Sequence, residues 1–183
     1  EYNESLLDFS GFESIESISG NISIQYNESL QNFNGFNNLR EIDGNLTILQ
    51  NDSIINMVGF DSLSGISGNL SILLNPELSD FTGIEHLQSI GGALNISFND
   101  KLQNCVGYSS LSTIGGGLLL KNNPSLKNVS GFADLNSIGV ALNIENNDSI
   151  ADLSGFLPLI NLTGELRING NSLITSLAGF ENV

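Results

Sequence analysis

The residues with the clearest capacity for chemistry are asparagines in Asn-x-Ser/Thr sequences, which accept N-linked glycans in secreted eukaryotic proteins. Ten such sequons, none with proline at x, occur in the 183 residues. Four of them, Asn3, Asn27, Asn51 and Asn147, fall in a regular column that we expect to be buried and unmodified. The remaining six are predicted to point outward and are the candidate glycosylation sites: Asn21, Asn45, Asn69, Asn95, Asn128 and Asn161.

The sequence contains few residues that could catalyse a reaction. Cys105 is the only cysteine, so the chain forms no internal disulfide, and it occupies a position that is apolar elsewhere in the sequence. His86, the only histidine, is predicted to be exposed. Five dispersed cations cannot line a cleft that stabilises an anionic transition state. We therefore expect no enzymatic activity and no cofactor.

One column of carboxylates invites a calcium hypothesis, because hard cations prefer clustered oxygen ligands. Proline and serine interrupt this column, no known calcium-binding motif accompanies it, and solvated turn residues explain it as well. We expect no metal site. The carboxylates are Glu4, Glu28, Asp52, Asp100 and Asp148, and the interruptions are Pro76, Pro124 and Ser172.

All these residues sit in a sequence that repeats every 24 residues without a slip. Glycine marks position 1 of each copy, at Gly11, Gly35, Gly59, Gly83, Gly107, Gly131, Gly155 and Gly179. Self-similarity at such a period is typical of a solenoid, in which each coil buries its apolar side against its neighbours. At 24 residues per coil, 183 residues make about 7.6 coils.

Within each copy, apolar residues at positions 12 and 14 alternate with polar ones, which predicts a short strand over positions 11–16. Because every copy runs in the same direction, these strands must stack in parallel. A second short extended segment is expected near position 8, among tight or 3-10 turns. Glycine recurs at position 10, which predicts either a positive φ or a close approach to the next coil.

Position 17 is asparagine in every copy. The side-chain amide both donates and accepts hydrogen bonds, so stacked copies can satisfy one another in a buried ladder. The predicted ladder comprises Asn3, Asn27, Asn51, Asn75, Asn99, Asn123, Asn147 and Asn171.

The Leu-x-Ile-x-x-Asn core resembles leucine-rich repeats, and more closely the L-domain repeats of the insulin and epidermal growth factor receptors. Their pattern is similar to Phe36, Leu39, Ile42, Gly44, Leu46, Ile48, Asn51 and Ile54. The resemblance implies a mainly β, right-handed parallel β-solenoid with little or no α-helix, serving as an extracellular, non-catalytic module. The cysteine-rich flanks of the receptor domains have no counterpart here, and neither end shows a capping element. We expect residues 1–183 to form one continuous solenoid, uncapped at both ends, within a longer array or covered by neighbouring subunits.

The outward strand face is the usual binding surface of such solenoids. Its candidate residues are Ser23, Thr47, Leu49, Ser71, Leu73, Asn95, Leu119, Asn143 and Arg167, and an ordinary solvated face is the alternative.

Charge and hydropathy limit the partners. A net charge of −15 disfavours nucleic acid and anionic membranes, and no apolar run approaches the 18 or so residues of a membrane span. We expect a structural or adhesive role at the cell surface, with self-association into a filament or surface layer. A receptor ectodomain that binds a protein or glycan ligand is the alternative. Ice binding is a third hypothesis, and the irregular mixture of side chains at position 13 disfavours it.

Overall fold

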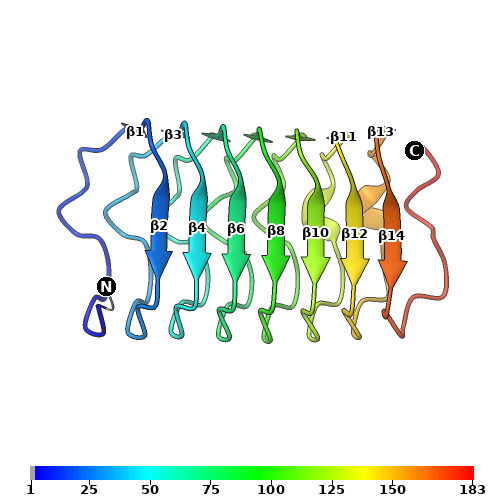
Figure 1. The fold of residues 1–183 in the computed structure, drawn as a ribbon, viewed down its shortest axis with the longest axis horizontal. Coiled ribbons are helices and arrows are strands. Elements are labelled where there is room, and N and C mark those ends of the chain that lie inside the picture. The colour runs from blue at the N-terminus through cyan, green and yellow to red at the C-terminus, as the bar shows by residue number, and fades with distance from the viewer. Residues whose placement is uncertain (1–2) are drawn as a thin grey trace.

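The computed structural model describes residues 3–183, so Glu1 and Tyr2 of the predicted single domain lie outside the description. The chain winds into a solenoid whose coils stack along one axis (Figure 1). Strands on the near side run downward while successive coils advance from left to right, which makes the coil right-handed. The fold is mainly β with almost no helix, as the sequence predicts, and the two stacks of strands extend over about six turns.

The larger sheet contains seven parallel four-residue strands. They occupy positions 12–15 of the repeat, so the predicted 11–16 segment is correct to one residue at each end. The first six alternate buried with more exposed residues, apart from the buried Ser97, as a strand with one apolar face must, whereas the last strand, in the outermost described coil, has no fully buried residue. The strands are β2 (Ile22–Gln25), β4 (Leu46–Leu49), β6 (Leu70–Leu73), β8 (Leu94–Ser97), β10 (Leu118–Lys121), β12 (Leu142–Glu145) and β14 (Leu166–Asn169).

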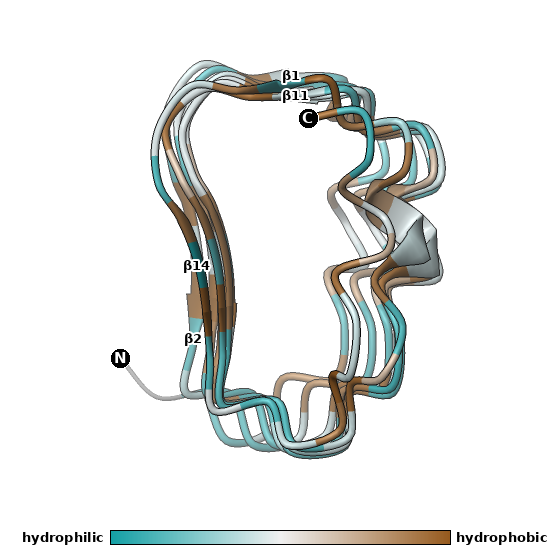
Figure 2. Ribbon diagram, turned by 90° about the vertical axis from the view of Figure 1, so that its right-hand side faces the viewer, coloured by the Kyte–Doolittle hydropathy of each residue, from teal (hydrophilic) through white to brown (hydrophobic). Residues whose placement is uncertain are grey.

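A second parallel sheet of seven two-residue strands forms the adjacent side of the coil, where the sequence predicts an extended segment near position 8. Seen end-on, the two sheets meet at a corner and the coils superpose (Figure 2). Its strands are β1 (Ser17–Ile18), β3 (Glu41–Ile42), β5 (Gly65–Ile66), β7 (Ser89–Ile90), β9 (Thr113–Ile114), β11 (Ser137–Ile138) and β13 (Asn161–Leu162).

The interior consists of columns of equivalent apolar side chains. At position 2, the rings of Phe36 and Phe60 stack with centroids 5.5 Å apart, and Tyr108 stacks on Phe132 at 5.4 Å. Ile84 interrupts this aromatic column between the two pairs. All five side chains are buried, so aromatic area contributes heavily to the cohesion between coils.

The position-1 glycine is required by its backbone in most coils. Gly83 has φ +108°, and a Cβ there would lie 2.4 Å from the Met57 carbonyl group. Its N–H donates to the Glu85 carboxylate at 2.9 Å, a contact that recurs wherever position 3 carries Glu, Asp or Asn. The other three coils carry Ser109, Ala133 and Leu157 at that position. The glycines of the Ala133 and Leu157 coils lie in the 3-10 turns η1 (Ser130–Phe132) and η2 (Ser154–Phe156).

The glycine at position 10 is required for a different reason. None of these glycines has a positive φ, so the close-approach alternative is the correct one. A Cβ on Gly44 would lie 2.6 Å from Gly20 backbone atoms and from Asn21 Oδ1. Val140, which replaces glycine in one coil, is likewise outside the positive-φ region and is therefore not strained in that way.

An unpredicted feature is a left-handed residue at position 16, directly after each long strand. The φ values run from 51° to 60° in Tyr26, Gln50, Leu74, Phe98, Asn122 and Asn146, and Gly170 continues the series at 63°. Large non-glycine residues in such conformations cost on the order of 1–3 kcal/mol each. The recurrence shows that the tight corner between strand and turn imposes this conformation whatever the residue type.

Three glycine-to-alanine variants separate conformational strain from steric contact. Gly20→Ala should change the free energy of unfolding by no more than about 0.5–1 kcal/mol, because Gly20 has neither positive φ nor a neighbour within 4 Å of the added Cβ. Gly11→Ala, with φ +111° in open space, should cost about 1–3 kcal/mol. Gly83→Ala combines both effects and should cost more than Gly11→Ala. Guanidinium-induced unfolding measures the series, and equal losses at Gly11 and Gly83 would show that contact between coils contributes nothing.

Candidate binding surfaces and modification sites

The column of asparagines at position 17 forms a continuous hydrogen-bonded ladder inside the turns. In a representative rung, Asn99 Oδ1 accepts from the backbone N–H and the amide of Asn75, at 3.1 and 3.4 Å. Its Nδ2 donates to the carbonyls of Ile72 and Ser97 and to Asn123 Oδ1, at 3.1, 3.2 and 3.3 Å. Every polar atom of the buried amide therefore has a partner, which is the condition for burying it at all.

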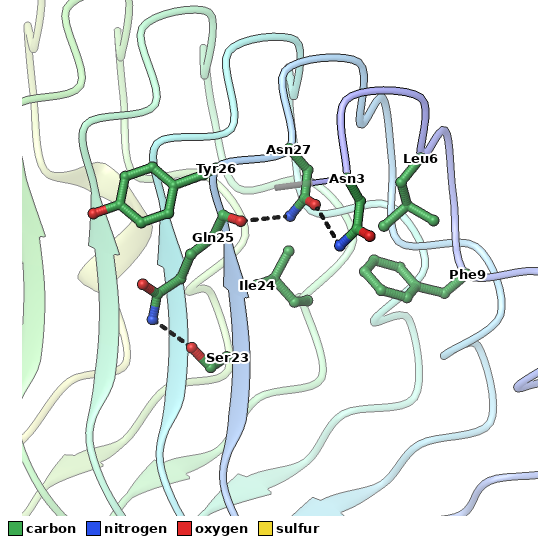
Figure 3. A pocket seen from close by; sticks show the side chains of 8 residues that line it. All are labelled: Asn3, Leu6, Phe9, Ser23, Ile24, Gln25, Tyr26 and Asn27. Atoms are coloured by element: carbon green, nitrogen blue, oxygen red, sulfur yellow. Dashed lines mark hydrogen bonds between the residues drawn. The ribbon is translucent and has the colours of Figure 1, made fainter. Parts of the chain in front are cut away.

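The ends of this inner ladder differ from its middle. Asn27, Asn51, Asn75, Asn99, Asn123 and Asn147 are buried. Asn3 is exposed and Asn171 half-buried, which corrects the prediction that Asn3 is buried. The reason is that each lies in the outermost described coil, so one side of its amide has no covering coil. Asn3 still donates to Asn27 Oδ1 at 3.3 Å (Figure 3).

A hollow of about 550 Å³ opens beside the first ladder rung, lined by Asn3, Leu6, Phe9, Ser23, Ile24, Gln25, Tyr26 and Asn27. Figure 3 shows Asn27 between Asn3 and the Gln25 carbonyl, while Tyr26 projects from the other side of the backbone and Gln25 turns toward Ser23. The hollow is the open side of the terminal coil, because Ile24 and Phe9 belong to columns that are covered in inner coils.

A second asparagine ladder lies outside the long strands, at position 11, and was not predicted. Asn21 Oδ1 accepts from the backbone N–H and the amide of Asn45, at 2.7 and 3.0 Å, and Asn45 accepts identically from Asn69. Asn69 Oδ1 then accepts from the Ala93 N–H at 2.7 Å, where the column ends. These residues are therefore structural as well as potential acceptors of glycans.

The other three candidate glycosylation residues occupy different environments. Asn95 is half-buried on strand β8, and its Oδ1 accepts from Ser97 Oγ at 2.6 Å. Asn128 is half-buried and caps a turn, because its Oδ1 accepts from the N–H and the hydroxyl of Ser130, at 3.2 and 2.8 Å. Asn161 is exposed at the start of β13.

The predicted binding face is assembled in strict register. One row aligns Ser23, Thr47, Ser71, Asn95, Leu119, Asn143 and Arg167, and a second row contains Leu49 and Leu73. Ser23 and Arg167 are exposed, and the rest are half-buried by their neighbours on the sheet. The structure thus gathers all nine predicted face residues on one surface of the larger sheet.

Ion pairs occupy the C-terminal half of this face. Lys121 Nζ lies 3.0 Å from Glu145 Oε1 across β10 and β12, and Arg167 pairs with Glu165 at 2.8 Å. The Lys121 contact is close but misaligned for a hydrogen bond, since Glu145 Oε1 lacks one within the described chain. The N-terminal half carries hydroxyls and the apolar Leu49 and Leu73, so the two halves offer different chemistry to a ligand.

The other side chains that could take part in chemistry do not form a catalytic or metal-binding cluster in the described residues. Burial raises the pKa of the Cys105 thiol and of the Tyr108 hydroxyl, so both remain protonated at neutral pH. His86 is exposed and its Nδ1 lies 2.8 Å from the Asp61 carbonyl oxygen. In residues 3–183, no three His, Cys, Asp or Glu side chains group closely enough to hold a metal ion. No helix within that range has the length and apolar character to cross a membrane.

The combination of a 24-residue coil, a seven-stranded parallel face and an inner asparagine ladder can be compared with known families. Residues 2–80 match the family model described as the receptor L domain. The matched stretch includes strands β1 to β6, and the unmatched coils repeat the same geometry. The predicted resemblance to receptor L-domain repeats is therefore confirmed. Comparisons with curated proteins and with solved structures gave no match.

The inner ladder yields a stability prediction. Asn99→Ala removes the acceptor of the Asn75 N–H and the donor to two buried carbonyls, and should cost about 3–5 kcal/mol of unfolding free energy. Asn171→Ala, at a half-buried rung with water access, should cost less than half as much. Chemical denaturation compares the two, and equal losses would contradict the dependence on burial.

Glycan occupancy should follow the environments of the sequons. In protein secreted from a eukaryotic host, we expect Asn161 to be modified most fully, and the buried Asn51 and Asn147 not at all. Asn45 and Asn69 should be modified less than Asn161, because their amide nitrogens donate within the outer ladder. Mass spectrometry of peptides before and after glycosidase treatment measures occupancy at each site. A glycan on Asn51 in folded protein would contradict the buried ladder.

Proposed function

We propose that this protein is a non-enzymatic recognition module of the receptor-ectodomain type, displayed outside the cell, which binds a protein or glycan ligand through its larger sheet. The observation that carries the proposal is the receptor L-domain match over residues 2–80, in a chain whose strands form one continuous outward face. The fold alone permits many functions, so the side chains on that face must support the assignment.

Three properties of the face support recognition. Its residues are fixed in position by parallel strands in unbroken register, so a ligand meets a preorganised surface. Its half-buried leucines, Leu49, Leu73 and Leu119, offer apolar contact among hydroxyl and amide groups. Its rows mix Ser, Thr, Asn, Leu and Arg, a variety that suits a specific ligand better than the regular lattice of ice.

A matched pair of double variants tests the proposal. Wild-type protein is applied to arrays of glycans and of secreted and cell-surface ectodomains, and each ligand found is titrated against the variants. Thr47→Arg with Leu119→Glu alters the strand face and should weaken binding at least tenfold, through lost contact area and new charge. Thr82→Arg with Val106→Glu introduces the same two charged residues at exposed turn positions and should leave affinity within twofold.

The outcomes are decisive in both directions. Ligands that bind the strand-face variant as tightly as wild type, or that are lost equally with the turn variant, contradict recognition through the sheet. Absence of any ligand on both arrays also counts against the proposal. Circular dichroism confirms that both variants keep the wild-type fold.

A structural or adhesive role through stacking of coils on coils is the second candidate. The outer sides of the terminal described coils expose apolar residues whose equivalents are buried inside, as with Phe12 at 46% exposure and Phe36 at 5%. At the other end, Leu177 is 56% exposed. Packing of one solenoid on another at such surfaces would bury these residues and support this role.

Sedimentation of the protein over a range of concentrations, with electron microscopy of the same samples, tests this second role. Fibres or concentration-dependent growth support it. A monomer at all concentrations excludes it and leaves the recognition proposal intact.

A further inference from the structure

A distinct pocket lies beyond the ends of strands β4, β6 and β8, where three coils turn away from the larger sheet. It has a volume of about 450 Å³ and is lined by Gln50, Leu74 and Phe98 at position 16 and by Asp52, Pro76 and Asp100 at position 18. We name these six residues the strand-end pocket. They differ from the residues of the strand face, which lie at positions 13 and 15.

Two apolar residues of the pocket are energetically unfavourable, both in their exposure to solvent and in their backbone conformation. Leu74 and Phe98 expose 45% and 50% of their surface, although both are large and apolar. Both also hold left-handed backbone conformations, at φ 56° and 60°. Later coils place Asn122, Asn146 and Gly170 at the same position, residue types that tolerate this conformation well.

The corner imposes the left-handed conformation, but the solenoid does not require a large apolar residue there, since asparagine or glycine at position 16 completes the same turn elsewhere in the chain. An exposed apolar side chain in a strained conformation is more readily explained by a contact made with another molecule. We call Leu74, Pro76 and Phe98 the apolar floor of the pocket. Charged residues bound this floor, because Pro76 lies between Asp52 and Asp100 in the column at position 18.

The charges at the pocket identify the kind of partner. Asp52 and Asp100 are exposed, and none of the ion pairs found in residues 3–183 involves either carboxylate. Lys101, the next residue in sequence, pairs with Glu77 instead, at 2.7 Å. Two carboxylates around an apolar floor match a side chain with an aliphatic stem and a cationic head.

We propose that the strand-end pocket docks an arginine-bearing segment of a partner protein. The arginine stem packs on Leu74 and Pro76, and the guanidinium lies over the face of Phe98. Asp52 and Asp100 are two coils apart, about 10 Å at a coil spacing of about 4.8 Å. Asp100 therefore lies on the guanidinium side of Pro76, and Asp52 attracts the cation from the other side. The net charge of −15 favours the approach of such a segment.

This inference goes beyond the proposed recognition through the sheet, because the two surfaces use different residues and can fail separately. The probe is the peptide acetyl-Gly-Leu-Arg-Leu-Arg-Gly-amide, titrated into isotopically labelled protein and followed by NMR. We expect the amide signals of Gln50, Asp52, Leu74, Phe98 and Asp100 to shift. The same peptide with glutamate in place of arginine should bind at least tenfold more weakly.

Protein variants separate binding from folding. Leu74→Asn with Phe98→Asn should weaken peptide binding at least tenfold while leaving the melting temperature unchanged or higher, because asparagine relieves the strain. Asp52→Asn with Asp100→Asn should weaken binding about tenfold and reduce its dependence on salt, without disturbing the apolar floor. Thr47→Arg with Leu119→Glu, the strand-face variant, should bind the peptide as wild type does.

Several results overturn the proposal. Shifts confined to other residues, or no shifts at millimolar peptide, exclude a docking site here. Equal binding of the glutamate peptide removes the role of the carboxylates. Unchanged binding by the Leu74 and Phe98 variant removes the role of the apolar floor. If that variant unfolds, the two side chains are structural, and retention of binding by the Asp52 and Asp100 variant completes the refutation.

Discussion

The structure depends on the buried side-chain amide of asparagine. This group is tolerated in an apolar interior only when its donors and its acceptor all form hydrogen bonds. In this chain the partner of each amide is the equivalent amide 24 residues away, together with backbone groups of the adjoining turns. A coil of different length would displace the next amide and leave these groups unpaired. The ladder therefore explains why the period runs through the sequence without a slip.

Coil-on-coil packing follows from that constraint. Once the turns are in register, the apolar columns superpose, the rings of Phe36 and Phe60 stack at 5.5 Å, and the strands pair residue for residue. The close spacing then demands glycine where backbones touch, at positions 1 and 10. Larger side chains are accommodated away from these two glycine columns, in the core and on the outward surfaces, and both candidate binding surfaces lie on the outward side.

Much of this arrangement could be predicted from sequence because it is local or periodic. Alternation at positions 12 and 14 predicts the strands, and the invariant asparagine predicts the inner ladder. The outer ladder of Asn21, Asn45 and Asn69 escaped prediction, because these asparagines also read as glycan acceptors and their contacts depend on the rise between coils. The left-handed conformation at position 16 was not predicted because Leu74 and Phe98 are residue types that rarely adopt it. Asn122, Asn146 and Gly170, at the same position, are residue types that favour it.

The two asparagine ladders have opposite polarity. Between side chains, the inner ladder donates toward the C-terminal coil, as Asn27 does to Asn51, whereas in the outer ladder Asn45 donates back to Asn21. The side-chain hydrogen bonds of the two ladders therefore run in opposite directions along the solenoid axis in the first coils. Beyond Asn69 the outer column contains Ala93, Gly117 and Ala141, so only the inner ladder continues there. The N-terminal coils are thus joined by two asparagine ladders and the later coils by one, an asymmetry along the molecule that its formal charges do not reveal.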